Sequence, residues 1–386
     1  MAELIPFDYD TLRLIWWFLL GLLLIGFAVM DGFDIGVAML LPIVGRTDTE
    51  RRVMINVIAP VWEGNQVWLI TGGGAIFAAW PILYAASFST FYLAMMLLLL
   101  ALILRPLGFK YRSKIADQRW RNTWDGVLSV GALVMALVFG VAMGNLLEGV
   151  AFDIDPITLR PVHGGGIMSL LGLFTPITIL CGVVSILMCA MHGAILLVWR
   201  TDSEVERRAR KLAIWLALLT AIFFALGGFF IPHIDGYVIT EMSSTIAPSN
   251  PLLKTVSTQP GAWMHNFIQW PLMWLAPVTG VGGALLAMVF VIAKRIKTAF
   301  VMSSLSITGI ILTIGFAIFP FLMPSAVMPE ASLTIWDASA SKLTLWIMLI
   351  ATVIFLPIVI SYTAYVYRVM RGKVTSDDVS TSPHAY

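Results

Sequence analysis

Long apolar stretches recur along almost the whole chain and restrict it to a fold embedded in a membrane. A run of about 17 to 25 predominantly apolar residues is long enough to cross a bilayer as a helix. The chain is 59% hydrophobic and 12% charged, and it has neither the alternating pattern of a β-barrel nor enough polar sequence for a soluble domain. Nine helices are predicted, at residues 14–44, 53–79, 81–104, 126–147, 166–199, 212–232, 262–293, 299–322 and 343–367. We therefore expect an all-α polytopic membrane protein with nine transmembrane helices.

Basic residues lie mainly in alternate connections between these helices. Most of the 24 Lys and Arg residues fall in five segments, at residues 46–52, 105–121, 200–211, 294–297 and 368–373. With nine helices all five segments share one side, and an excess of Lys and Arg marks the cytoplasmic side. The sequence predicts a periplasmic N-terminus, a cytoplasmic C-terminus, one membrane domain over residues 1–374 and a cytoplasmic tail at 375–386. We expect two four-helix bundles and one peripheral helix.

Three carboxylates interrupt the first two predicted helices. They are Asp31 and Asp34 in GFAVMDGFDIG and Glu63 in WEGNQVW. An acid in hydrocarbon costs about 2.5 to 3.5 kcal/mol on insertion scales, so it commonly marks a proton relay, an ion pathway or a buried pair. At about 1.5 Å of rise per residue, all three fall near mid-membrane, and Asp31 and Asp34 share a helix face. We expect the three to meet and carry protons; a buried pairing network or a helix cap is the alternative.

Polar and aromatic neighbours of these acids could support that role. Asn65 and Gln66 follow the third acid closely and are expected to orient it or to bind water. Arg105 ends the third predicted helix, where it either pairs with one of the acids or extends to the interface. Trp62 and Trp68 flank the third acid, so they either line a cavity for a small molecule or serve packing.

The histidines and cysteines of the sequence do not have the spacing of ligands for a redox centre. The five histidines, His163, His192, His233, His265 and His384, form no helical pair for two haems and no cluster with metal-ligand spacing. His192 alone clearly lies inside a predicted helix, where a packed polar residue is the ordinary interpretation and an axial ligand the alternative. Cys181 and Cys189 are about 12 Å apart along one helix, too far for a disulfide. We expect no metal bound by this chain and no nucleic-acid partner, since no basic stripe with interleaved aromatic residues is present.

A secondary transporter is the second hypothesis. Transporters also place ion sites near mid-membrane, and Asp31, Asp34 and Glu63 would then form the coupling site. This hypothesis requires inverted repeats and a substrate site on broken helices, and the sequence shows no strict repeat. Solute uptake by the isolated chain in proteoliposomes would favour it.

Several segments are distinctive when they are taken together. They are RLIWW, DGFDIG, ERRVMINVIAPVWEGNQVWLITGGGAIFAAWP, RPLGFKYRSK, WRNTWD, GNLLEGV, DGYV, GAWMHNF, FPFLMPS and SLTIWDASASKLTL. Together they resemble subunit II of the cytochrome bd-type quinol oxidases, over nearly the whole chain.

The resemblance implies a complex of the bacterial cell inner membrane that oxidises quinol on the periplasmic side and reduces oxygen to water with cytoplasmic protons, generating proton motive force. It implies haems b558, b595 and d on a partner, subunit I, so this chain would be inactive alone. Some members also bind a quinone in subunit II, and whether a small single-helix subunit joins the complex stays open. This chain would be a scaffold and part of the proton path.

The resemblance also implies roles for individual residues. Glu63 matches the acid of the family's W-D/E-G-N segment and is the expected proton carrier, whereas Asp31 and Asp34 match the DGFD motif. Trp68 stands where the family has an aromatic residue near oxygen access, and Arg105 matches an RP motif.

Two positions depart from the family pattern. Lys110 stands where relatives often carry an acid, and Val61 where they often carry a histidine. Glu63 itself keeps the acid of the family's W-D/E-G-N segment. The resemblance therefore supports a proton role for Glu63 more firmly than any route leading to it.

Overall fold

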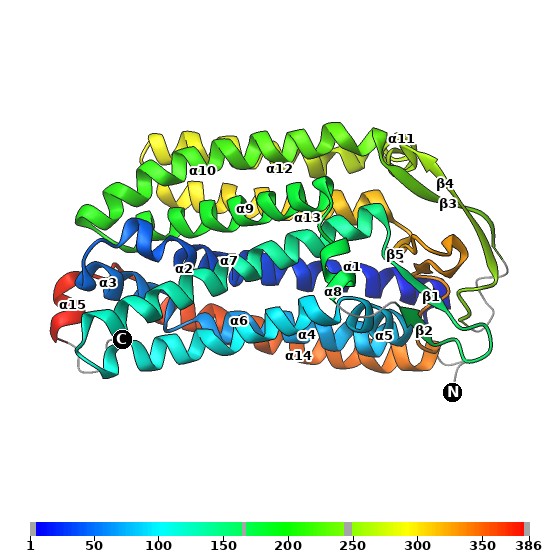
Figure 1. The fold of residues 1–386 in the computed structure, drawn as a ribbon, viewed down its shortest axis with the longest axis horizontal. Helices are drawn as coiled ribbons and strands as arrows, with labels where there is room; N and C mark the ends of the chain where they lie inside the picture. The colour runs from blue at the N-terminus through cyan, green and yellow to red at the C-terminus, as the bar shows by residue number, and fades with distance from the viewer. Residues whose placement is uncertain (1–4, 164–166, 243–248, 382–386) are drawn as a thin grey trace.

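Eight long apolar helices form the body of the computed structural model, which describes residues 5–163, 167–242 and 249–381. By length and composition, each of the eight could cross a membrane, and they run side by side along the long axis of the molecule (Figure 1). The first comprises α1 (Tyr9–Met30) and α2 (Gly32–Val44). The others are α6 (Tyr92–Tyr111, extended by a 3-10 turn), α7 (Gln118–Glu148), α9 (Pro176–Arg200), α10 (Ser203–Phe230), α12 (Leu275–Ile292), α13 (Ile296–Ile318) and α14 (Lys342–Val369).

The second predicted helix is broken, which corrects the expectation of one span over 53–79. Its sequence forms α3 (Asp48–Ile58) and α4 (Trp62–Ala79), separated by a turn at Pro60. Proline lacks the N–H that a helix interior needs, and its ring clashes with the preceding turn. The next predicted helix, 81–104, divides into α5 (Pro81–Thr90) and α6, which continues seven residues beyond the predicted end.

Prolines divide two further predicted helices. The expected span 166–199 becomes the short helix α8 (Ile167–Gly172) and α9, which begins at Pro176 after Thr175 caps it. The expected span 262–293 becomes α11 (His265–Gln269), a 3-10 turn from Pro271 and then α12. Proline suits the first turn of a helix because its missing N–H would have no partner there, so each of these prolines starts a new segment instead of continuing the last.

Close contact between α2 and α9 forms the centre of the molecule. Every residue of α2 except Pro42 and Ile43 is buried. A Cβ atom added at Gly36 would lie 2.0 Å from the carbonyl oxygen of Cys189, so only glycine permits this approach. On its other side α9 packs with α10 and α13, and α12 packs on both of these helices. By contrast, α14 has Leu345 as its one buried residue among those described.

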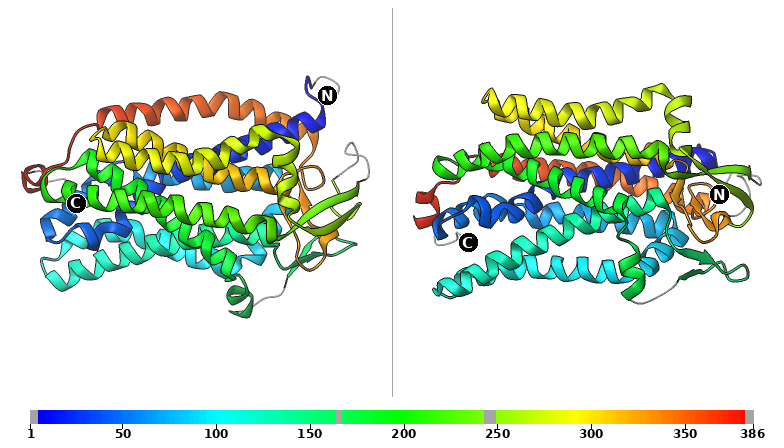
Figure 2. Two further views of the ribbon diagram at one scale, coloured as in Figure 1. Left: turned by 90° about the horizontal axis from the view of Figure 1, so that it is seen from above. Right: turned by 45° about the horizontal axis from the view of Figure 1, so that its top comes forward.

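One end of the bundle carries β-hairpins, so the all-α expectation is incomplete. Three antiparallel pairs lie there (Figure 1 and Figure 2). They are β1 (Phe152–Ile154) with β2 (Pro161–His163), β3 (Asp235–Met242) with β4 (Lys254–Pro260), and β5 (Phe321–Met323) with β6 (Leu333–Thr334). Lys254 Nζ lies 2.8 Å from Asp337 Oδ2 and fastens β4 to the segment after β6. Burial lowers the pKa of Lys254, although the Asp337 carboxylate opposes that shift.

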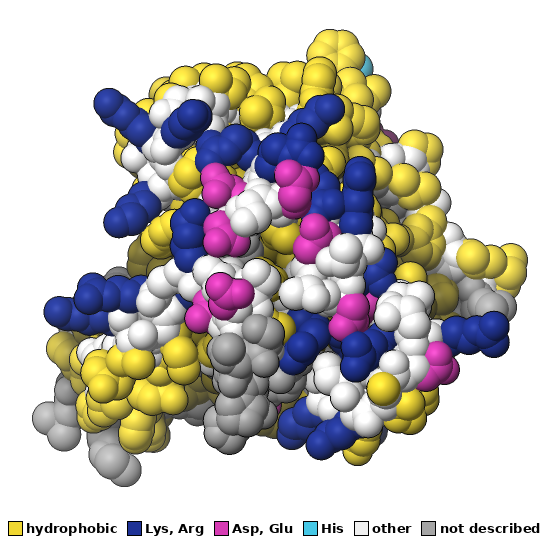
Figure 3. All heavy atoms as spheres, turned by 90° about the vertical axis from the view of Figure 1, so that its left-hand side faces the viewer, with side chains coloured by type: hydrophobic (Ala, Val, Ile, Leu, Met, Phe, Trp, Pro, Cys, Tyr) yellow, Lys and Arg dark blue, Asp and Glu magenta, His cyan; other side chains and the backbone are white. Residues whose placement is uncertain are grey.

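The opposite end is highly charged. Lys and Arg side chains gather there, with Asp and Glu between them (Figure 3). Arg112 pairs with both Asp125 and Asp48, and Arg121 Nη1 lies 2.7 Å from Asp48 Oδ2. Residues 105–125, which connect two predicted helices, are mostly helical, because α6 runs to Tyr111 and α7 begins at Gln118. Part of the predicted tail is also ordered: α15 (Ser376–Thr381) packs on α3, whereas residues 382–386 lie outside the described residues.

Candidate functional site

Two carboxylates and one guanidinium meet inside the bundle. Arg105 Nη1 donates a 3.0 Å hydrogen bond to Asp31 Oδ2, and Arg105 Nη2 lies 2.8 Å from Asp31 Oδ1. The same Nη2 lies 3.6 Å from Asp34 Oδ2. Both acids are fully buried and Arg105 is 5% exposed. Arg105 therefore pairs with both acids and does not extend to the interface.

The local sequence explains how the two acids share one cation. Asp31 lies at the junction of α1 and α2, where the backbone stays helical, since the Ile35 N–H donates to the Asp31 carbonyl at 2.9 Å. Asp34 is therefore almost one turn further along the same face. Because α2 is buried, both carboxylates point into protein, where the Arg105 guanidinium partly compensates their charge.

An amide and a phenol extend this cluster toward α14. Asn65 Nδ2 donates a 2.7 Å hydrogen bond to Asp34 Oδ2, and the Tyr367 hydroxyl donates a 2.7 Å hydrogen bond to Asn65 Oδ1. We call Asp31, Asp34, Arg105, Asn65 and Tyr367 the acid cluster. The sequence identified the first four as site candidates but not Tyr367, which is 302 positions from its partner and stands in an apolar helix with two other tyrosines.

The structure does not bring Glu63 into the acid cluster. Its side chain is exposed, whereas Asn65 is 1% exposed. Residues two apart on a helix point about 200° from each other, so α4 cannot direct both side chains inward. Among the described residues, no hydrogen bond or ion pair joins Glu63 to Asp31 or Asp34. The expectation that all three acids meet is therefore wrong, because α4 is oriented about its axis so that Asn65, and not Glu63, faces Asp34.

The two candidate tryptophans have different surroundings. Trp62 is buried, packs on Phe109 with ring centroids 5.3 Å apart, and lies 5.5 Å from the guanidinium carbon of Arg105. Trp68 lines a cleft of about 440 Å³ between α1, α4 and α14. Gln66 is half-buried on α4. Trp62 thus supports the acid cluster, whereas Trp68 lies at a cavity wall.

His192 is engaged on both sides of its ring. Its Nδ1 lies 2.7 Å from Ser303 Oγ, and its Nε2 lies 3.1 Å from the carbonyl oxygen of Val29. The imidazole therefore links α9 to α13 and α1, as expected of a packed polar residue. His384 and the side chain of His163 lie outside the described residues. Within the described part of the chain, no group of three His, Cys, Asp or Glu residues could hold a metal ion.

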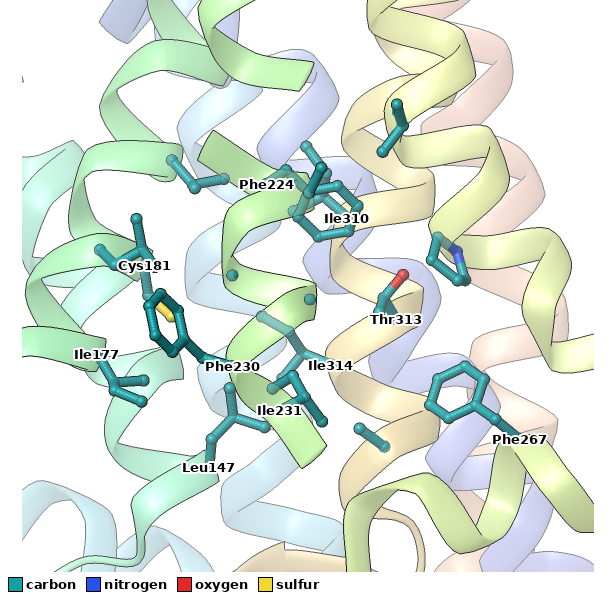
Figure 4. Close-up of a pocket in the computed structure, with 18 of the residues that line it drawn as sticks. Leu147, Ile177, Cys181, Phe224, Phe230, Ile231, Phe267, Ile310, Thr313 and Ile314 are labelled. Carbon is teal, nitrogen blue, oxygen red and sulfur yellow. The ribbon is translucent and has the colours of Figure 1, made fainter. Parts of the chain in front are cut away.

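A second cavity lies at the hairpin end, between α9, α10, α12 and α13. It has a volume of about 310 Å³ and an almost wholly apolar lining, including Phe224, Ile310 and Ile314 (Figure 4). The Thr313 hydroxyl on its wall donates to the carbonyl of Gly309 at 2.7 Å, and the Cys181 thiol also lines it. Such a lining suits an apolar group and provides no charge for a polar one.

Comparison with known proteins assigns the chain to a family. The profile of cytochrome bd terminal oxidase subunit II matches residues 12–370. Cytochrome bd-I ubiquinol oxidase subunit 2 of Escherichia coli is 50% identical over 379 residues, which cover 98% of this chain and 99% of the relative. A probable cytochrome oxidase subunit 2 of Haemophilus influenzae is 47% identical over 98% of this chain and 99% of its own length.

The fold agrees with that assignment. A chain in the structure of bd oxidase from Geobacillus thermodenitrificans superposes with a TM-score of 0.68 at 16% identity, covering 93% of this chain and 98% of that one. At that identity the likeness concerns the fold alone. The family rests on the profile match and on the relatives that are aligned over nearly their whole length. The chain therefore belongs to the cytochrome bd terminal oxidase subunit II family.

Proposed function

We propose that this chain works with a haem-bearing subunit I in a quinol oxidase of the bacterial inner membrane. The complex would oxidise quinol, reduce oxygen to water and generate proton motive force, with haems b558, b595 and d on subunit I. The name and 50% identity of the Escherichia coli relative support this role. They favour an oxidase over the secondary transporter. This chain would serve as scaffold and as part of the cytoplasmic proton path.

The acid cluster is the observation that carries the proton role. Two buried carboxylates share one guanidinium, so the three groups carry a net charge of −1 when both acids are ionised, and one proton makes them neutral. Asp34 Oδ1 has no hydrogen-bond partner among the described residues. It can take a proton without breaking an existing hydrogen bond. A site with these two properties is suited to proton loading and release.

Glu63 would connect this chain to its partner. The exposed residues of α4 recur at helical spacing, with Glu63 followed by Val67, Ile70, Gly74 and Phe77. Gly64 and Thr71 are also exposed on α4, and the Thr71 hydroxyl donates to the carbonyl of Val67 at 2.9 Å, so Glu63 is the one charged residue on this face. An apolar face alone would suit lipid, but a carboxylate that faces hydrocarbon is costly. We therefore assign this face of α4 to subunit I, with Glu63 passing protons across the contact.

The topology follows from the same proposal. The charged end would be cytoplasmic and the hairpin end periplasmic, because Lys and Arg accumulate on the cytoplasmic side. Together, α4 and α5 would complete a ninth crossing between these ends (Figure 1). One four-helix bundle would contain α9, α10, α12 and α13, the other the remaining crossings except α14. The cleft beside Trp68 has the size and apolar lining for a quinone tail.

Glu63→Gln tests the proton role, because it keeps the size of the side chain and removes its charge. Quinol-driven oxygen consumption should fall by about 10²-fold or more, the usual contribution of a positioned proton-transfer group, while haem content stays normal. The matched control is Glu204→Gln, since Glu204 is exposed at the charged end and pairs with Arg207 of its own helix. Normal turnover in the Glu63 variant would refute the proton role. Loss of haem would instead assign Glu63 to assembly.

A further inference from the structure

We propose that Tyr367 is a positioning residue for Asp34, acting through the side-chain amide of Asn65. The inference deepens the proposed proton role of the acid cluster and partly rests on it. Tyr367 reaches the cluster from α14, a long helix with one buried residue among those described, so a peripheral helix determines how a buried acid is hydrogen-bonded.

The amide of Asn65 has two orientations with opposite consequences. In the observed one, the Tyr367 hydroxyl donates to Oδ1 at 2.7 Å, so Nδ2 faces Asp34 and donates to it at 2.7 Å. Asp34 must then accept, which an ionised carboxylate does. After a flip of the amide, Oδ1 would face Asp34 and would accept a hydrogen bond only from a protonated carboxyl. The Tyr367 hydroxyl can donate or accept a hydrogen bond. In the observed arrangement it donates to Oδ1, which supports the orientation that stabilises ionised Asp34.

One ring contact fixes Tyr367 itself, and two hydrogen bonds fix the end of its helix. Its ring meets the buried ring of Phe33, the neighbour of Asp34, edge-on at a centroid distance of 6.4 Å. Beyond it, Arg200 Nη2 donates to the carbonyl of Met370 at 2.5 Å, and the Val374 N–H donates to the carbonyl of Arg200 at 2.7 Å. The end of α14 is thus anchored to α9. Tyr367 is therefore held by the Phe33 ring and by the anchored end of its own helix.

Other titratable groups surround Asp34. Arg105 and Asp31 lie beside it, from α6 and from the junction of α1 and α2. From α9, Cys189 packs close to this junction, and His192 bonds to the backbone just before it. None of these groups bonds to the amide of Asn65, whose two described partners are Asp34 and Tyr367. The proposed control therefore passes through one amide.

The test uses Tyr367→Phe in the intact complex, which removes only the hydroxyl. The matched control is Tyr365→Phe, because Tyr365 is 66% exposed on the same helix. Infrared difference spectroscopy follows the protonated-carboxyl band that Asp34→Asn abolishes. We expect its titration midpoint to rise by about 0.5 to 1 pH unit in Tyr367→Phe, the value of one hydrogen bond, and to stay unchanged in Tyr365→Phe. The alkaline limb of the pH profile for oxygen consumption should move in the same direction.

A double-mutant cycle with Asn65→Ala separates positioning from a direct effect. If Tyr367 acts through the amide, Tyr367→Phe adds no further shift in the Asn65→Ala background. An unchanged midpoint, an additive shift, or loss of haem from Tyr367→Phe would each overturn the proposal. A shifted infrared midpoint with an unchanged pH profile of turnover would support positioning of Asp34 and refute its place in the proton path, so the two proposals fail separately.

Discussion

Replacing Arg105 by leucine should damage assembly more than any other single change in the acid cluster. The substitution removes the only described partner of Asp31, one of two partners of Asp34, and a cation packed near Trp62. Leaving a buried charge without its partner costs about 3 to 5 kcal/mol. Here two carboxylates lose the same cation, so the cost should lie at the upper end of that range.

The structure also predicts which second change restores stability. Asp34 keeps its hydrogen bond from Asn65 after the loss of Arg105, whereas Asp31 keeps none among the described residues. Asp31→Asn should therefore rescue Arg105→Leu better than Asp34→Asn does, by about the 1.5 to 3 kcal/mol of a hydrogen bond to a charged group. Rescue of this kind cannot come from Arg105 acting as an interfacial anchor.

The assay is the thermal unfolding midpoint and haem absorption of the purified complex, for Arg105→Leu alone and with each second substitution. Lys110→Leu is the control, because Lys110 is exposed on the same helix. Two results would refute the reasoning: an Arg105→Leu midpoint equal to that of Lys110→Leu, or equal rescue by the two asparagine substitutions.

Two further predictions concern the scaffold. Gly36→Ala should separate α2 from α9 and lower the yield of assembled complex, because the added Cβ meets backbone at 2.0 Å and overpacking costs about 1 to 3 kcal/mol. Gly21→Ala is the control: its added Cβ meets nothing within 4 Å, so the yield in the same purification should be unchanged. At the start of α3, partial burial raises the pKa of Glu50, but the N–H groups of Arg46 and Thr47 and the Arg208 guanidinium outweigh it, so the pKa lies below its ordinary value. A carboxyl whose pKa is depressed in the folded state stabilises that state above the ordinary pKa, and this effect is lost as the pH falls through the folded-state pKa. Amide exchange in the first turn of α3 should therefore accelerate below about pH 4.5. Equal exchange in wild type and Glu50→Gln across that pH range would contradict this prediction.

Most of the long helices could be predicted from the local sequence. The apolar lengths located the long helices, and the predicted spans 299–322 and 343–367 differ from α13 and α14 by only a few residues at their ends. Three of the breaks have a common cause, because Pro60, Pro176 and Pro271 divide apolar runs that look continuous by composition alone. The break between α5 and α6 lies at Phe91, without a proline. The β3–β4 hairpin was missed because residues 233–261, between two predicted helices, are rich in Pro, Ser and Asn and give little strand signal before their two halves pair.

The candidate site was predicted less completely. Asp31, Asp34, Arg105 and Asn65 were recognised because polar groups in apolar helices are costly and therefore conspicuous. Their pairing was left open, and Tyr367 was missed because a tyrosine in such a helix is ordinary by composition. Glu63 was placed with the other acids because depth along a helix is readable from sequence, whereas rotation about its axis is not.

The sequence by itself indicated a multi-pass membrane protein and predicted acids near mid-depth, because both inferences depend on the local cost of placing each residue type in hydrocarbon. The tertiary structure decided which acids turn inward and which turns outward. That choice depends on the turn before α4, on the glycine contact between α2 and α9, and on a hydroxyl that arrives 302 positions later in the chain. Such contacts are set by packing between distant segments, and no local pattern specifies them.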